Sequence, residues 1–100
     1  MGREQMKAYV VDDDPVFRKS YRGALERRCG FGSVGEADTA EVALEQIMSE
    51  KPDLVLCDTI FGARPVGLAL CRSLRQAGYT GKIIGMSSID FEERWKAEGA

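Results

Sequence analysis

Residues 8–15 read AYVVDDDP, and this stretch decides the fold. Its apolar part, Ala8 to Val11, has the length of a strand and stops abruptly at three aspartates and a proline. Asp14 suits the N-cap of a helix, and Pro15 suits the first helical turn, where its missing N–H would have no partner in any case. We therefore expect a strand that ends in carboxylates and passes directly into a helix.

A second stretch has the same design. Residues 52–58 read PDLVLCD, in which four successive apolar residues precede Asp58. A continuous apolar run of this length is typical of a strand that is buried on both faces of a parallel sheet. This strand too is expected to end in a carboxylate.

The rest of the chain alternates between short apolar runs and longer stretches of helical spacing. Residues 16–29 predict a helix whose arginines we interpret as a solvated face. Asp38 and Glu41 form a capping box for a second helix, and Gly78 closes a third. Further elements are expected as strands at 33–37 and 83–86, a loop at 59–65, and a last helix from about residue 90 toward residue 99. The alternation predicts an α/β domain with a parallel sheet flanked by helices.

Helical spacing also predicts which side chains form the core. The expected apolar stripes of the three helices are Phe17, Tyr21, Ala24, Leu25 and Cys29, then Val42, Ala43, Ile47 and Met48, then Leu68, Leu70, Cys71 and Leu74. The three cysteines are far apart and odd in number, which fits neither a disulfide framework nor a zinc knuckle. We expect all of them to be reduced, buried thiols.

Composition limits the possible functions. One hundred residues with 44% hydrophobic content suit a single domain over residues 1–100. A net charge of −2 without a basic run argues against nucleic acid as a direct partner. The chain lacks a signal-like apolar start and a membrane-length apolar run, so we expect a cytoplasmic protein without membrane contact. The absence of histidine excludes imidazole bases and His-ligated zinc from this chain.

Asp12, Asp13 and Asp58 are the candidate site. In doubly wound sheets, ligands bind beyond the carboxyl ends of the strands where strand order reverses, which for order 2-1-3-4 lies between the first and third strands. Two carboxylates at about 4 Å repel each other by about 4 kcal/mol at an effective dielectric near 20, so three together need a counter-charge. Oxygen-only ligands favour Mg²⁺, beside which Asp58 would act as the nucleophile toward phosphorus.

Three stretches resemble the receiver domain of bacterial two-component response regulators: residues 10–15, residues 52–58 and residues 82–87, which read KIIGMS. The resemblance covers essentially the whole chain. It implies a flavodoxin-like three-layer sandwich with sheet order 2-1-3-4. It also implies a signalling protein whose Asp58 receives a phosphoryl group from a sensor histidine kinase or a phosphotransfer protein. Such a protein is not an enzyme beyond its own phosphorylation from a donor and its own dephosphorylation.

The resemblance further implies a ligand set and a switch residue. Mg²⁺ would be held by Asp13, Asp58 and the main-chain carbonyl of Ile60, with Asp12 contributing directly or through water. Ser87, at the end of the fourth strand, would be the hydroxyl that binds the phosphoryl group and shifts position as the switch.

The chain also departs from that family. Receiver domains continue beyond the positions of Gly99 and Ala100 into a fifth strand and helix that begin with an essential lysine. Lys7 and Lys82 cannot replace this lysine, because they begin strands at the opposite end of the sheet. The loop at 59–67 carries one extra residue. Without the fifth strand and helix, an open edge and bare apolar surface would remain, so we expect a homodimer that covers them.

Other interpretations stay open at this point. Capping alone explains Asp12 to Asp14, and a polar exit from a strand explains Ser87, although capping does not explain Asp58. A degenerate receiver that serves as a binding or dimerisation module would fit the missing lysine. A haloacid-dehalogenase-like phosphatase would use Asp12 and Asp14 as its nucleophile motif, but the Gly and Thr expected after the second aspartate are absent.

Overall fold

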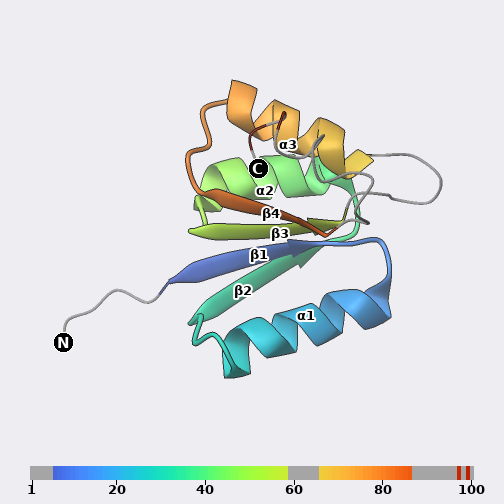
Figure 1. The fold of residues 1–100 in the computed structure, drawn as a ribbon, viewed down its shortest axis with the longest axis vertical. Helices are drawn as coiled ribbons and strands as arrows, with labels where there is room; N and C mark the ends of the chain where they lie inside the picture. The colour runs from blue at the N-terminus through green and yellow to red at the C-terminus, as the bar shows by residue number, and fades with distance from the viewer. Residues whose placement is uncertain (1–5, 59–65, 87–96, 98, 100) are drawn as a thin grey trace.

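The computed structural model describes residues 6–58, 66–86, 97 and 99. Helices and strands alternate along the chain (Figure 1). The elements are β1 (Lys7–Val11), α1 (Pro15–Arg27), β2 (Ser33–Ala37), α2 (Ala40–Glu50), β3 (Leu54–Asp58), α3 (Val66–Gln76) and β4 (Lys82–Met86). The last helix expected from the sequence, with Asp90, Glu93 and Trp95, falls outside the described residues.

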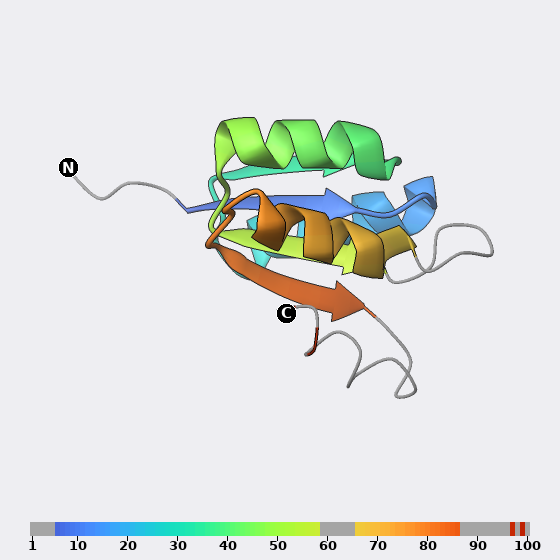
Figure 2. The same cartoon turned by 90° about the horizontal axis from the view of Figure 1, so that it is seen from above.

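The four strands form one parallel sheet in the order β2-β1-β3-β4. Helix α1 covers one face of the sheet, and α2 and α3 cover the other (Figures 1 and 2). This arrangement confirms the expected α/β class, the three layers and the strand order of a flavodoxin-like fold. Among the described residues, no helix combines the length and apolar character needed to span a bilayer.

Side chains along each strand point alternately to the two faces of the sheet, and this divides the core into two clusters. On the α2 and α3 side, Tyr9, Val55 and Ile83 pack with buried residues of both helices. On the α1 side, a smaller cluster contains Val10 and Leu25. Successive strand residues point to opposite faces, so a continuous apolar run supplies both clusters at once. This is why β1 and β3 had to be apolar without interruption.

Side-chain caps begin the first two helices. Asp14 is the N-cap of α1, where its side chain accepts a hydrogen bond from the Val16 N–H at 2.9 Å, and Pro15 follows at the first helical position, as the sequence predicted. The predicted cap of α2 was wrong by one residue. Thr39, with extended backbone angles, is the cap, and its hydroxyl accepts from the Val42 N–H at 3.3 Å. The helix therefore begins at Ala40, and Asp38 precedes its cap.

Three apolar residues expected in the core are exposed instead. Val42 is 43% exposed and Phe17 is 55% exposed, while Cys29 lies on the surface beyond the end of α1. On α2, Ala43 and Ile47 are buried because they lie one turn apart on the face toward the sheet. Val42 is rotated by about 100° from Ala43 around the helix axis and so leaves that face. Cys57 and Cys71 are buried, as predicted.

The two neighbours on α2 give a test of this packing. We expect Ile47→Ala to lower the free energy of unfolding by about 2–5 kcal/mol, because it removes a fully buried side chain and leaves a cavity. Val42→Ala, on the exposed face of the same helix, should change it by less than about 0.5 kcal/mol. Urea denaturation of the two variants measures both values, and equal losses would contradict the placement of α2.

Candidate functional site

Asp12, Asp13 and Asp58 come together at the carboxyl ends of β1 and β3. Val11, the last residue of β1, lies opposite Cys57 of β3, so the residues that follow reach the same edge of the sheet. One carboxylate oxygen from each aspartate can be chosen so that all three lie within 4.8 Å of one another. The structure thus brings together the three acidic residues that the sequence singled out.

The backbone around Asp12 is held by several hydrogen bonds. Asp12 is only 4% exposed, and its N–H donates to the carbonyl of Ala37 in β2 at 3.2 Å. Its carboxylate accepts from the N–H of Asp14 at 2.9 Å. Asp14 uses its own carboxylate to cap α1, so its role in the structure is the cap that the sequence predicted. Asp13 is exposed and Asp58 is half-buried, which leaves the cluster open to solvent on one side.

Burial and neighbouring charges shift the pKa values of titratable groups at the carboxyl ends of β1 and β3. Burial raises the pKa of Asp12, the hydrogen bond from Asp14 opposes this, and the charges of Asp13 and Asp14 raise the pKa further. Burial also raises the pKa of the Cys57 thiol, and the Asp58 carboxylate adds to the effect. The Cys57 thiol therefore stays protonated at neutral pH, so it serves neither as a nucleophile nor as a metal ligand.

The donor set of this site fits a hard divalent cation. Three carboxylates at such distances repel one another, and an ion that accepts oxygen ligands would relieve that repulsion. Among the described residues, Asp12, Asp13 and Asp58 are the ones that would hold Mg²⁺. Ile60 and Ser87, the other two residues assigned to the site from the resemblance, fall outside the described residues.

Lys7 and Lys82 lie far from this cluster along the strands. They are the first residues of β1 and β4, whereas Asp58 is the last residue of β3 and pairs in register with Met86 at the end of β4. All strands are parallel, so the two lysines lie at the opposite edge of the sheet. The structure therefore places both lysines at the end of the sheet that the sequence predicted for them.

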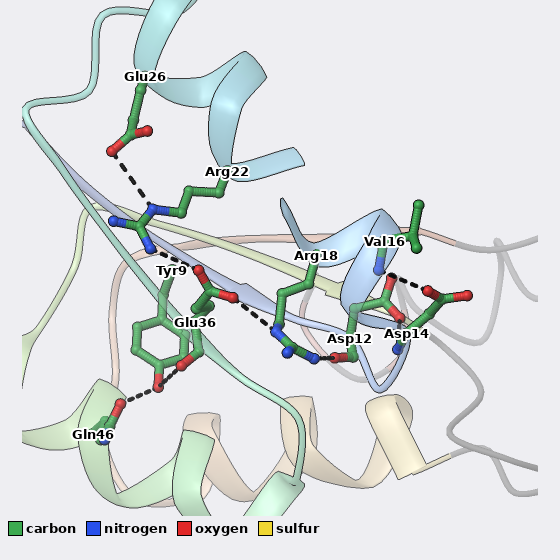
Figure 3. A network of polar contacts seen from close by, with 9 residues as sticks. All are labelled: Tyr9, Asp12, Asp14, Val16, Arg18, Arg22, Glu26, Glu36 and Gln46. Atoms are coloured by element: carbon green, nitrogen blue, oxygen red, sulfur yellow. Dashed lines mark hydrogen bonds and ion pairs between the residues drawn. The ribbon is translucent and has the colours of Figure 1, made fainter. Parts of the chain in front are cut away.

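An ion-pair network beside the site was not anticipated (Figure 3). Arg18 and Arg22 of α1 donate to the two carboxylate oxygens of Glu36 in β2, at 2.8 and 2.7 Å. Arg18 also donates to the carbonyl of Asp12 at 2.9 Å, and only 16% of its side chain is exposed. The interpretation of all α1 arginines as a solvated face is therefore wrong for Arg18. Its spacing of four from Arg22 was the available signal, but no sequence pattern places Glu36 opposite them.

This network gives a prediction for stability against pH. Hydrogen bonds from Arg22 and Arg18 lower the pKa of Glu36 below its ordinary value of 4.5. Because the folded-state pKa is the lower one, the stabilisation is complete above pH 4.5 and is lost as the pH falls toward the folded-state pKa. We expect Glu36→Gln to lower the free energy of unfolding by about 1–2 kcal/mol at neutral pH and by much less in acid. The effect is of this size because hydrogen bonds to charged partners are stronger than neutral ones.

Denaturation of Glu36→Gln across the acid range measures this effect. Glu45→Gln, at an exposed position of α2, is the matched control and should stay close to the unaltered chain at every pH. A loss of stability in Glu36→Gln that is the same in acid and at neutral pH would contradict the role assigned to the ion pairs.

Comparison with known proteins identifies the family to which the chain belongs. A family model described as the response regulator receiver domain matches residues 8–97. Response regulator MprA of Mycobacterium avium is 36% identical over 85 residues, which are 85% of this chain and 36% of that protein. Sensory transduction protein LytT of Bacillus anthracis is 43% identical over 53 residues, or 53% of this chain and 22% of that protein. The chain thus spans about a third or less of the length of these relatives.

Solved structures agree with this assignment. The signal receiver domain of the putative response regulator NarL from Mycobacterium tuberculosis superposes with a TM-score of 0.84 at 26% identity, covering 98% of this chain and 81% of that one. A LuxR-family two-component response regulator from Aurantimonas sp. SI85-9A1 gives a TM-score of 0.83 at 28% identity, covering 97% of this chain and 71% of that one. The chain belongs to the response regulator receiver domain family of two-component signalling.

Proposed function

We propose that this receiver domain is a phosphoacceptor whose Asp58 carboxylate takes a phosphoryl group in the presence of Mg²⁺. The observation that carries the proposal is the convergence of Asp12, Asp13 and Asp58 within 4.8 Å at the carboxyl ends of two neighbouring strands. Capping accounts for Asp14 but does not account for this convergence. The family supports the same assignment.

The chemistry requires a carboxylate that can attack phosphorus. An oxygen of Asp58 forms a bond to the phosphorus as the bond between phosphorus and the donor's leaving group breaks, and the product is an acyl phosphate. Mg²⁺, when bound, supplies positive charge that offsets the charge of the phosphoryl oxygens. Asp13, Asp58 and the main-chain carbonyl of Ile60 would hold that ion, with Asp12 contributing directly or through water. Ser87 binds the phosphoryl group as the switch hydroxyl.

The donor we propose is the phosphohistidine of a sensor histidine kinase or of a phosphotransfer protein. Family membership supports a partner of this class, and the cytoplasm is the compartment in which we place the exchange. The domain itself carries out no reaction beyond taking and losing its own phosphoryl group. We propose no nucleic acid partner for these residues, because their net charge is −2 and they contain no basic run.

Replacement of the acceptor tests the proposal. We expect the unaltered chain to gain one phosphoryl group from a small acyl-phosphate donor with Mg²⁺, and Asp58→Asn to gain none, because an amide oxygen is a poor nucleophile. Intact-mass spectrometry measures the gain. Asp14→Asn is the matched control and should retain phosphorylation, since asparagine caps a helix as well as aspartate does. Phosphorylation that persists in Asp58→Asn would refute the assignment.

The same experiment separates the alternatives. A degenerate receiver that acts only as a binding or dimerisation module would show no phosphorylation in the unaltered chain, and its partner binding would be independent of Mg²⁺ and donor. A phosphatase of the haloacid-dehalogenase type would carry the phosphoryl group on Asp12. Mapping of the modified residue by peptide mass spectrometry distinguishes these outcomes.

We also propose a homodimer in which a second copy covers the open side of β3 and β4. Ile83 belongs to the cluster under α2 and α3, so Ile84 points to the α1 side, where it is 40% exposed. Leu54 and Leu56 of β3 lie on the same side and are only half-buried. Among the described strands β4 is also an edge, and an apolar edge with a partly bare face favours association.

Light scattering at micromolar concentration tests the dimer. We expect the unaltered chain to be dimeric and Ile84→Glu to raise the dimer dissociation constant by about tenfold or more, because a carboxylate would be buried without a partner. Val42→Glu places the same charge at a comparably exposed site on α2, where it should leave association unchanged. A well-folded monomer of the unaltered chain would overturn this proposal.

A further inference from the structure

The side chain of Arg18 links helix α1 to the main chain of the acidic cluster (Figure 3). One terminal nitrogen donates to the carbonyl of Asp12 at 2.9 Å, and Nε donates to Glu36 at 2.8 Å. With 16% of its side chain exposed, Arg18 is the more deeply covered of the two arginines bound to Glu36, since Arg22 is 46% exposed. A guanidinium with several donors in a fixed plane can hold two acceptors at a defined angle.

The carbonyl that Arg18 contacts belongs to the peptide between Asp12 and Asp13. This peptide is planar and rigid, so the direction of its carbonyl also fixes the direction in which the chain enters Asp13. On the other side, the Asp12 N–H is bound to Ala37 at 3.2 Å, and the Asp12 carboxylate accepts from Asp14 at 2.9 Å. Arg18 thus adds the contact that restrains rotation of the peptide joining two members of the cluster.

Glu36 fixes the orientation of the Arg18 guanidinium. An arginine beside three carboxylates could turn toward them as their counter-ion and compete with a metal. Glu36 is a carboxylate on the β2 side, and Arg22 fixes its second oxygen at 2.7 Å. With Nε engaged by Glu36, the guanidinium of Arg18 meets Asp12 at the carbonyl, and the ion pair supplies a counter-charge outside the cluster.

We propose that Arg18, held by Glu36, is a positioning residue that orients the Asp12–Asp13 peptide and thereby raises the affinity of the acidic cluster for a divalent cation. This inference rests on the metal site of the proposed function. The change in Mg²⁺ affinity that it predicts for loss of Arg18 is opposite in sign to that of a pure charge effect. Removal of a cation near the cluster should tighten Mg²⁺ binding by charge alone, whereas loss of positioning should weaken it.

Calorimetric titration of the full chain with Mg²⁺ tests the proposal. We expect Arg18→Met, which keeps the aliphatic part of the side chain but removes the donors, to weaken Mg²⁺ binding about 10–100-fold, as is typical for residues that orient metal ligands. Lys19→Met is the matched control, because it removes a neighbouring positive charge of α1 at an exposed position. Its effect on Mg²⁺ affinity should stay within about threefold, because solvent screens an exposed charge.

A metal-free measurement accompanies the titration. In Arg18→Met, the backbone amide resonances of Asp13 and Asp14 should shift in NMR spectra recorded without Mg²⁺, because the peptide before Asp13 loses its hydrogen bond. In Lys19→Met these two resonances should stay in place. Far-UV circular dichroism shows whether each variant is folded. Should Arg18→Met fail to fold, Arg18→Lys keeps the charge but cannot serve both acceptors, and it should weaken Mg²⁺ binding as well.

Each outcome has a distinct meaning. Unchanged or tighter Mg²⁺ binding in folded Arg18→Met, or in Arg18→Lys where the first variant does not fold, overturns the positioning role. Failure of the unaltered chain to bind Mg²⁺ overturns both this inference and the metal site of the proposed function. If Arg18→Met binds Mg²⁺ more weakly but Asp58 of the unaltered chain accepts no phosphoryl group, the inference is supported and the proposed phosphoacceptor function is refuted.

Discussion

The close approach of like charges at the ends of β1 and β3 is the constraint on which the rest of the structure depends. The two strands run parallel and adjacent, so Asp12, Asp13 and Asp58 meet with carboxylate oxygens within 4.8 Å. At that distance each pair repels by roughly 3 kcal/mol at an effective dielectric of 20. The fold has to offset this repulsion by burying the apolar residues that precede the carboxylates. The same two strands thus carry the apolar residues of the core and lead, at their carboxyl ends, to the acidic residues.

Arg18 places a positive charge beside the acidic cluster through contacts with the main-chain carbonyl of Asp12 and with Glu36. Glu36 is itself fixed by Arg22, and its main-chain carbonyl lies 3.3 Å from the hydroxyl of the buried Tyr9. This arrangement connects α1, β2 and β1 beside the site.

The two faces of the sheet differ in how completely they are covered. Helices α2 and α3 lie over one face of the sheet (Figure 2). Tyr9, Val55 and Ile83 are buried in the cluster on that face. On the other face, α1 lies over β1 and β2, while Leu54 and Leu56 of β3 are half-buried and Ile84 of β4 is exposed. The apolar residues of β3 and β4 on this face are therefore less completely covered than those of β1 and β2, over which α1 lies.

The strands, the class of the fold and the acidic triad could be read from the sequence, because each rests on short-range patterns. Continuous apolar runs specify strands buried on both faces, and Asp14 with Pro15 specifies the start of α1. The parallel order then brings the ends of β1 and β3 to one edge without further information. The cap of α2 was missed by one residue, because Asp38 and Thr39 both have capping side chains and only the packing of Ala43 and Ile47 selects the phase of the helix.

What only the tertiary structure decided concerns contacts between elements that are distant along the chain. Arg18 resembles the other arginines of α1 in sequence, and its burial follows from Glu36, which β2 places opposite it. Val42 and Phe17 are apolar residues at helical spacing, yet they are exposed because the sheet can cover only one stripe of each helix. Sequence periodicity identifies which residues can be buried, whereas the position of the neighbouring element determines which of them are.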